Sequence, residues 1–254
     1  MSTFPDKFRL DGRTALVTGS ARGLGWEMAK GLAEAGARVL LHGRSHKQLT
    51  PRLAELRAAG HEADALAFEM ADRAAMAAEV AAAGPIDILV HNVGERDRRP
   101  FAEIQPDDFT RLVDTNLSAG QALIHHLLPG MVERGWGRLI LVSSIAADLA
   151  APGASSYIAA KAGLAALARA LAAEFGAKGI TSNALSPGFF ATETNAALIA
   201  STAGERMRAR CPAKRWAEPW EIAGAAVFLA SPAAAYVNGH TLAVDGGVSA
   251  TYIA

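Results

Sequence analysis

Short runs of β-branched and aliphatic residues alternate with longer, alanine-rich stretches of helical period along this chain, and this alternation restricts its fold more than any other feature. The runs that predict strands are Thr14–Val17, Arg38–His42, Ala63–Phe68, Ile86–His91, Arg138–Ser143, Thr181–Leu185 and Thr241–Val244. The stretches that predict helices are Gly23–Ala35, His46–Ala59, Ala74–Ala82, Pro106–Leu128, Ser155–Phe175 and Pro219–Ala230. Such alternation is typical of parallel strands joined by right-handed crossovers. We therefore expect an α/β fold: a doubly wound parallel sheet of about seven strands with helices on both faces.

No repeat, low-complexity tract or linker divides the chain, so residues 1–254 are predicted to form a single domain. The hydrophobic fraction of 51% is enough for a substantial core. Lys+Arg and Asp+Glu each number 25, which gives a net charge of zero, whereas a protein that neutralises many phosphates is basic. This balance argues against a dedicated nucleic-acid-binding protein. The single cysteine, Cys211, excludes an intrachain disulfide and a cysteine-based zinc site.

Nothing in the sequence predicts a membrane or secretory segment. The first ten residues contain no apolar run long enough for a signal peptide. The stretch from Ile222 to Val244 carries no Asp, Glu, Lys or Arg, but Ser231-Pro232 and Asn238-Gly239-His240 interrupt it and would break a spanning helix. We interpret it as a buried helix, a turn and a short strand, and we expect a soluble, cytoplasmic protein.

A glycine-rich loop links the first predicted strand to the first predicted helix, with the sequence Thr18-Gly19-Ser20-Ala21-Arg22-Gly23-Leu24-Gly25. Glycines permit a tight turn and the close approach of a pyrophosphate, while the helix N-terminus provides free N–H groups. The spacing is G-x-x-x-G-x-G rather than the more usual G-x-G-x-x-G. By itself the loop is also compatible with a plain strand-to-helix turn, but its place after the first strand favours a dinucleotide site.

The end of the second predicted strand bears on which dinucleotide is bound. Sites for NAD carry an acidic residue there, which bonds the ribose 2′-hydroxyl. Here the strand ends in His42-Gly43-Arg44-Ser45, without a carboxylate. Arg44, with Arg22 of the glycine loop, could instead hold a 2′-phosphate. Each arginine alone is equally compatible with a solvated surface, but together they favour NADP over NAD.

Tyr157 and Lys161 are four residues apart and share one face of a predicted helix. A tyrosine serves as acid or base at neutral pH only if its phenolate is stabilised by about 4 kcal/mol. A lysine one turn away, helped by a positively charged nicotinamide, is a plausible source. Alone, the pair is typical of an ordinary helix surface. Ser143 and Ser144 change this interpretation, because they end a strand at the edge where open α/β sheets bind ligands.

Further polar positions complete the pattern: Asn116 in the long middle helix, Asn92-Val93-Gly94 after the fourth strand and Pro187-Gly188 after the sixth. This set resembles the short-chain dehydrogenase/reductase family over nearly the full chain. The resemblance implies a Rossmann-type fold and a dinucleotide-dependent enzyme that acts on the CH–OH group of donors, with no metal, since hydride passes directly between nicotinamide and substrate. With the two arginines, this predicts an NADP-dependent enzyme. Two positions depart from the family pattern. His91 precedes Asn92 where the family has a second asparagine, and Glu69-Met70 replaces the frequent Asp-Val; we interpret His91 as a packing residue.

The resemblance also assigns roles to individual residues. Tyr157 would be the general acid in carbonyl reduction and the base in alcohol oxidation, Ser144 would hold the substrate oxygen, and Lys161 would lower the pKa of the tyrosine and bind the nicotinamide ribose. Asn116 would anchor a water chain that relays protons to Lys161. Thr18, Gly19, Gly23 and Gly25 would form the phosphate loop, Asn92 and Gly94 would line the adenosine side, and Thr192 would hold the carboxamide. The other residues expected to contact the cofactor are Arg22, Leu24, Arg44, Tyr157, Lys161, Pro187 and Gly188.

The sequence says less about the substrate. Arg96, Arg98 and Arg99 follow the fourth strand, where they either form a solvent-facing charged turn or meet an anionic substrate. Residues 189–216 are predicted to be a mobile lid. The arginines that make this lid basic are Arg206, Arg208, Arg210 and Arg215, most of which we expect to be helix-surface charge, with one or two steering a carboxylate or phosphate.

The C-terminal third looks most like gluconate 5-dehydrogenases, in stretches such as 186–195 and 210–216, although relatives including 3-oxoacyl-carrier-protein reductases share parts of it. The leading hypothesis is therefore an NADP(H)-dependent enzyme that interconverts a ketone and a secondary alcohol, with a keto-sugar acid such as 5-ketogluconate as first candidate. The alternatives are a 3-oxoacyl-thioester reductase and a catalytically idle dinucleotide-binding sensor. A homotetramer is also expected from the resemblance, and the alanine-rich helix 155–175 suits either a subunit interface or tight packing on the sheet.

Overall fold

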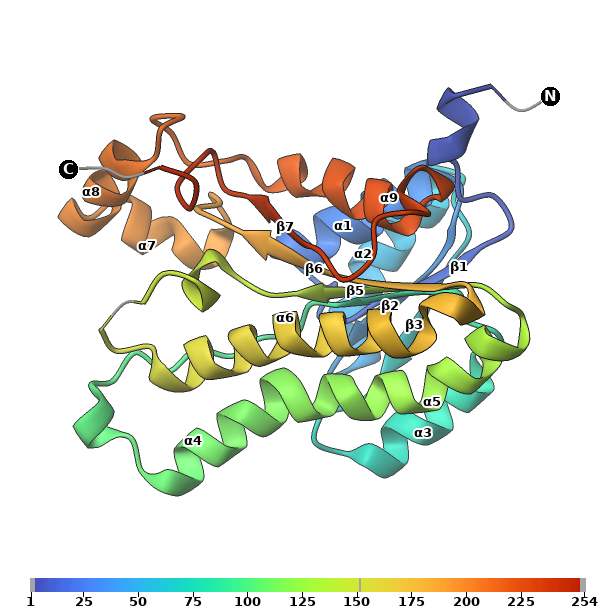
Figure 1. Cartoon of the computed structure of the whole chain (residues 1–254), viewed down its shortest axis with the longest axis horizontal. Helices are drawn as coiled ribbons and strands as arrows, with labels where there is room; N and C mark the ends of the chain where they lie inside the picture. Colours follow the sequence, from blue (N-terminus) through green and yellow to red (C-terminus); the bar gives the residue numbers. More distant parts are fainter. Residues whose placement is uncertain (1–2, 151, 252–254) are drawn as a thin grey trace.

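The computed structural model describes residues 3–150 and 152–251 and contains one parallel sheet (Figure 1). Its seven strands follow the order β3-β2-β1-β4-β5-β6-β7, and each neighbouring pair is parallel. The strands are β1 (Thr14–Val17), β2 (Arg38–Gly43), β3 (Ala63–Ala67), β4 (Ile88–His91), β5 (Gly137–Val142), β6 (Ile180–Pro187) and β7 (Thr241–Val244). All lie within two residues of the predicted positions, and the predicted doubly wound α/β fold is confirmed.

Helices cover both faces of this sheet. They are α1 (Gly23–Glu34), α2 (His46–Ala58), α3 (Arg73–Ala82), α4 (Pro106–Val113), α5 (Ala119–Glu133), α6 (Ser155–Phe175), α7 (Ala196–Ile199), α8 (Thr202–Arg210) and α9 (Ala223–Ala230). Short 3-10 turns occupy Pro5–Phe8, Phe101–Glu103, Ile145–Ala147, Gly176–Lys178, Glu193–Asn195, Pro219–Ile222 and Pro232–Ala234. Helices α7 and α8, which the sequence did not predict, lie at the end of the sheet where the strands terminate (Figure 1).

The core consists of two apolar layers, one on each face of the sheet. Because successive side chains of a strand point to opposite faces, Val17 packs with α1, α2 and α9, while its neighbour Leu16 packs with α3, α5 and α6. Figure 1 shows α3, α5 and α6 together on one side and α1 and α9 on the other. Burial on both faces explains why the strands read as continuous apolar runs.

The strand order reverses at β1, whose two neighbours are β2 and β4. Chain segments that leave β1 and β4 therefore turn to opposite faces, and a crevice opens between them at the carboxyl ends of the strands. This is the place that the topology provides for a ligand.

The long middle helix differs from its prediction in two respects. It is interrupted by one π turn, Asp114–Ser118, and it continues past Pro129 to Glu133, whereas the sequence predicted an end at Leu128. Pro129 lacks the N–H that would bond the carbonyl of His125, but His125 is exposed, so water can bond that carbonyl instead.

The charge-free stretch 222–244 forms α9, a turn and β7, as predicted. Within residues 3–150 and 152–251, no helix combines the length and apolarity that crossing a bilayer requires.

Candidate active site

A cleft of about 1150 Å³ opens at the carboxyl ends of the strands. Two of the predicted site residues, Thr18 and Asn116, are fully buried and lie behind its lining. The other predicted residues all line it: Gly19, Arg22, Gly23, Leu24, Gly25, Arg44, Asn92, Gly94, Ser144, Tyr157, Lys161, Pro187, Gly188 and Thr192. Residues from six separate segments of the chain thus meet around one cavity.

The glycine loop follows β1 and can hold a phosphate-bearing ligand closely. Gly19 and Gly23 have φ angles of 64° and 57°, which residues with a side chain rarely adopt. A Cβ added to Gly25 would lie 2.3 Å from the carbonyl oxygen of Gly19. The loop therefore requires glycine at these positions, and it packs without side chains against the start of α1.

The end of β4 is bonded to the end of β1. The Thr18 hydroxyl accepts hydrogen bonds from the backbone N–H groups of Asn92 (2.9 Å) and Val93 (3.2 Å). In return, Asn92 Nδ2 donates to the carbonyl oxygens of Thr18 (3.1 Å) and Gly19 (3.3 Å). Asn92 thus braces the glycine loop from across the crevice.

Arg22 and Arg44 stand exposed at one end of the cleft. Within the described ranges, neither guanidinium is hydrogen bonded or paired with a carboxylate, whereas the neighbouring Arg52 pairs with Glu55 at 2.8 Å and stacks on Trp26. The end of β2 carries no acidic side chain. This end of the cleft can therefore accept a dianionic group.

Tyr157 and Lys161 lie one turn apart on α6 and are almost fully buried, with 7% and 2% of their surfaces exposed. Lys161 Nζ donates to the carbonyl oxygen of Val142 at 2.7 Å and lies 5.8 Å from the centre of the Tyr157 ring. Ser143 Oγ donates to the carbonyl oxygen of Lys161 at 2.8 Å, which ties α6 to the end of β5. Burial alone would raise the pKa of Tyr157, but the charges of Lys161 and Arg96 and hydrogen bonds from Arg96 and Ser144 outweigh it, so that pKa lies below its usual value.

Asn116 lies in the π turn between α4 and α5, behind the cleft. Its Oδ1 accepts from the backbone N–H of Glu95 at 2.7 Å, and its Nδ2 donates to the carbonyl oxygen of Glu95 at 2.9 Å. The side chain thus fixes the loop that follows β4. Its expected function in a proton relay remains a prediction.

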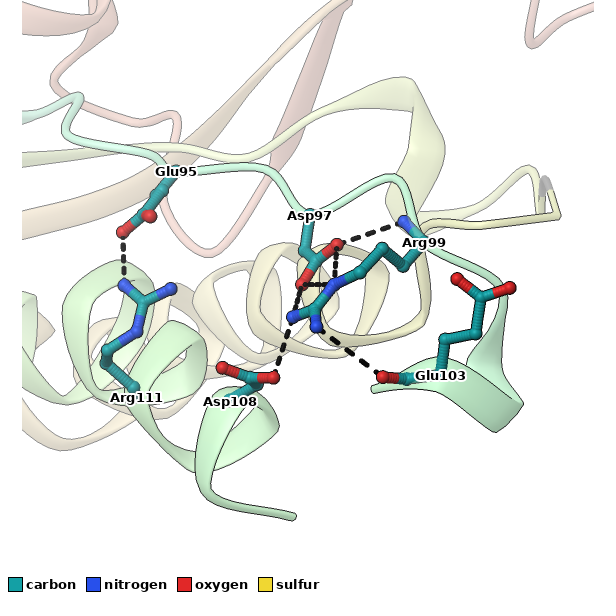
Figure 2. A network of polar contacts seen from close by, with 6 residues as sticks. All are labelled: Glu95, Asp97, Arg99, Glu103, Asp108 and Arg111. Atoms are coloured by element: carbon teal, nitrogen blue, oxygen red, sulfur yellow. Dashed lines mark hydrogen bonds and ion pairs between the residues drawn. The ribbon is translucent and has the colours of Figure 1, made fainter. Parts of the chain in front are cut away.

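The charged segment after β4 is mostly paired with itself and with α4 (Figure 2). Arg99 bonds Asp97 and, at 2.7 Å, Asp108, while Glu95 pairs with Arg111 at 2.7 Å. Arg99 is therefore committed to a structural network. Arg96 and Arg98 instead line the cleft, and Arg96 Nη2 donates to the Tyr157 hydroxyl at 3.2 Å.

Comparison with known proteins agrees with this geometry. The family model described as enoyl-(acyl carrier protein) reductase matches residues 19–249. The gluconate 5-dehydrogenase of Gluconobacter oxydans is 40% identical, over 96% of this chain and 98% of that protein. The chain belongs to the short-chain dehydrogenase/reductase family.

Two further members of this family bear on the site. The crystal structure of a gluconate 5-dehydrogenase from Burkholderia cenocepacia in complex with NADP and tartrate has a TM-score of 0.92 and 39% identity, and covers 97% of this chain and 99% of that one. The 3-oxoacyl-[acyl-carrier-protein] reductase of Vibrio cholerae is 34% identical, over 94% of this chain and 98% of that protein. The protein is an oxidoreductase of this family.

Sequence reasoning missed His42, the last polar residue of β2. Its Nδ1 accepts from the backbone N–H of Gly19 at 3.2 Å, so the ring proton is on Nε2, which donates to the carbonyl oxygen of Phe68 at 3.1 Å. Burial lowers the pKa of His42 to about 4. A histidine at the end of an otherwise apolar strand, beside a phosphate loop, was the available signal.

His91, which departs from the family pattern, is fully buried. Its Nδ1 lies 3.4 Å from the Thr18 hydroxyl and its Nε2 lies 3.3 Å from the carbonyl oxygen of Asn116. Burial, with the nearby charge of Lys161, lowers its pKa to about 3. The residue packs at the strand end, and it also links the glycine loop to the π turn.

The arginines of segment 189–216 do not reach the cleft lining. Arg208 pairs with Glu205 on α8, and Arg215 pairs with Glu221 at 2.5 Å. Arg208 is thus helix-surface charge, as the sequence predicted, whereas Arg215 lies in the turn that follows α8. The side of the segment that does line the cleft is formed by Phe190 and residues 192–195.

Proposed function

We propose that this protein interconverts a ketone and a secondary alcohol with NADP(H), and that Tyr157 is the general acid and base. The observation that carries the proposal is the nearly buried Tyr157 in a cleft that the glycine loop also lines, with the cations of Lys161 and Arg96 both close to its ring. Cations in a site of low dielectric stabilise a phenolate far more than they would in water.

Each residue has a distinct function in this proposal. The bound dinucleotide supplies or accepts the hydride. Tyr157 gives its proton to the carbonyl oxygen in reduction and takes the hydroxyl proton in oxidation, and Ser144 holds that oxygen by a hydrogen bond. Lys161 favours the phenolate and bonds the nicotinamide ribose. Asn116 anchors a water chain toward Lys161.

The cofactor would lie along the crevice. Its pyrophosphate would meet the glycine loop, with Thr18, Gly19, Gly23, Leu24 and Gly25; its adenosine would lie toward Asn92 and Gly94; and its carboxamide would lie near Pro187, Gly188 and Thr192. Arg22 and Arg44 would hold the 2′-phosphate of NADP, because both are free of carboxylates within the described residues and no acidic side chain ends β2. The NADP complex of the Burkholderia relative supports this preference over NAD.

For the substrate we propose a keto-sugar acid such as 5-ketogluconate. Relatives named for gluconate chemistry and the guanidinium groups of Arg96 and Arg98 in the cleft support it. A 3-oxoacyl thioester is the second candidate, supported by the Vibrio relative. The pairing of Arg208 and Arg215 with glutamates reduces the basic surface that an acidic carrier protein would need. A catalytically idle sensor is disfavoured because the full set of Asn116, Ser144, Tyr157 and Lys161 is present.

The test is oxidation of NADPH and of NADH against a panel of ketones that includes 5-ketogluconate and a 3-oxoacyl thioester. We expect turnover with NADPH that the Tyr157→Phe variant lacks, although that variant should still bind NADPH. A preference for NADH would contradict the assignment of Arg22 and Arg44. Tight binding of NADPH without turnover of any ketone would favour the sensor.

We also propose that the chain is a single-domain, cytoplasmic homotetramer in which residues 189–216 close over the substrate. The large exposed side chains of Trp220 and Tyr236 suit burial in a subunit interface. Light scattering at the concentration of the activity assay tests the assembly, and a monomeric mass would contradict it.

A further inference from the structure

Arg96 makes two contacts with Tyr157 that the resemblance did not assign. Its Nη2 donates to the Tyr157 hydroxyl at 3.2 Å, and its guanidinium carbon lies 4.7 Å from the centre of the phenol ring. The cation therefore faces both the oxygen that would exchange a proton and the ring that would share the resulting negative charge.

The backbone that carries Arg96 is held on both sides. Before it, both backbone groups of Glu95 bond the side chain of Asn116, and the Glu95 carboxylate pairs with Arg111 of α4. After it, Asp97 bonds Arg99, which also bonds Asp108 of α4 (Figure 2). An exposed arginine on a free loop would lose much conformational entropy on making such a contact, and this bracing reduces that loss.

The loop that precedes α6 also limits the movement of this segment. A Cβ added to Gly153 would lie 2.7 Å from the carbonyl oxygen of Arg98, so the two backbones nearly touch. Since this loop leads directly into the helix that carries Tyr157, Arg96 and Tyr157 are positioned by segments that contact one another.

The charged and hydrogen-bonding groups around Tyr157 come from three elements. Lys161 faces it from α6, Ser144 from the end of β5, and Arg96 from the loop after β4. The other charged residues near this part of the cleft are Glu95, Arg98, Arg111 and Glu193, of which Glu95 and Arg111 pair with each other. Lys161 uses one of its N–H groups to bond the carbonyl oxygen of Val142. Arg96 is therefore a second cation beside Tyr157, and it bonds the hydroxyl directly.

We propose that Arg96 is a further catalytic residue, which stabilises the phenolate of Tyr157 together with Lys161. The inference rests on the proposed function of Tyr157 as acid and base. In alcohol oxidation, the phenolate accepts the hydroxyl proton, the C–H bond gives its electron pair as hydride to NADP⁺, and the C=O bond forms. Arg96 keeps its proton throughout and makes the phenolate available at lower pH.

The direct test is a near-ultraviolet titration of tyrosine ionisation in the cofactor-free protein. The chain contains only three tyrosines, so the difference between the wild type and Tyr157→Phe isolates Tyr157. In Arg96→Gln we expect the Tyr157 midpoint to rise by about one pH unit, the lower end of the range for a nearby opposite charge, because Arg96 is exposed. Arg96→Lys should recover part of the shift.

Arg98→Gln is the matched control, because Arg98 lines the same cleft without a bond to Tyr157. In this variant the Tyr157 midpoint should equal that of the wild type. An unchanged midpoint in Arg96→Gln, or an equal shift in both variants, would overturn the proposal. This readout needs no substrate, so it is separate from the test of the proposed function.

Kinetics give a second readout once a substrate is found. At pH values below the Tyr157 midpoint, kcat/KM of Arg96→Gln for alcohol oxidation should be about tenfold lower than that of the wild type. At alkaline pH the two values should be equal. If Arg96 only bound a substrate carboxylate, KM for the anionic substrate would rise at every pH while a neutral secondary alcohol would be unaffected. That result would refute the proposal.

Discussion

Replacing Gly120 by alanine tests how firmly the imidazole of His91 is held between the glycine loop and α5. A Cβ on Gly120 would lie 2.6 Å from both Cδ2 and Nε2 of His91, closer than any van der Waals contact. The ring is fully buried and has polar contacts at both nitrogens, so it cannot turn away without losing one of them.

The magnitude follows from three terms. Overpacking a filled site costs about 1–3 kcal/mol. Loss of the contact between His91 and the carbonyl of Asn116 costs about 1 kcal/mol. Alanine is the better helix former by about 1 kcal/mol. The free energy of unfolding of Gly120→Ala should therefore be lower than that of the wild type by about 1–3 kcal/mol.

Denaturant unfolding at fixed protein concentration measures this change, and a double-mutant cycle assigns it. In a His91→Ala background the ring is gone, so Gly120→Ala should be neutral or stabilising. Gly224→Ala in α9 is the matched control: a Cβ there has no atom within 4 Å, and the variant should be stabilised. An equal cost of Gly120→Ala with and without His91 would refute this reasoning.

Three further outcomes are expected. Gly25→Ala should abolish NADPH binding in a fluorescence titration, because its Cβ would lie 2.3 Å from the carbonyl oxygen of Gly19; retained affinity would contradict the rigidity of the loop. Arg44→Asp should reduce the ratio of kcat/KM for NADPH to that for NADH by at least about tenfold, since an arginine–phosphate contact is replaced by repulsion. His42 and His91, whose pKa values burial lowers to about 4 and about 3, bind protons more readily in the unfolded chain. The free energy of unfolding should therefore fall as the pH drops below about 6.5, by about 1.4 kcal/mol per pH unit for each histidine, and His42→Asn should flatten the slope.

The strands were predictable because burial on both faces leaves a continuous apolar run, and turn residues mark its ends. Val39, Leu40 and Leu41 illustrate this, since all three are fully buried although they point to alternate faces. The glycine loop was predictable for a related reason, because its backbone conformation excludes side chains at Gly19 and Gly23.

The contacts of Asn116 with Glu95 and of Arg96 with Tyr157 depend on tertiary packing, so no local sequence pattern predicts them. The π turn at Asp114–Ser118 has no local signature, yet it aims Asn116 at the backbone of Glu95. Likewise, three arginines within four residues looked equivalent in sequence. In the structure Arg99 pairs with Asp97 and with Asp108 of α4, whereas Arg96 contacts Tyr157.

The reversal of strand order at β1 divides the cleft between two stretches of chain. The groups proposed to select the dinucleotide precede β4, whereas Ser144, Tyr157 and Lys161 all follow it. At the cleft, the stretch from β1 to α2 is joined to the segment after β4 through Asn92, His91 and the β1–β4 ladder, while the rest of it packs on α9 and β3. Exchanging residues 43–52 for those of an NAD-using relative should therefore alter the choice of cofactor, while Ser144, Tyr157 and Lys161 keep their geometry. Evolution can thus change the cofactor preference and the proton-transferring group separately.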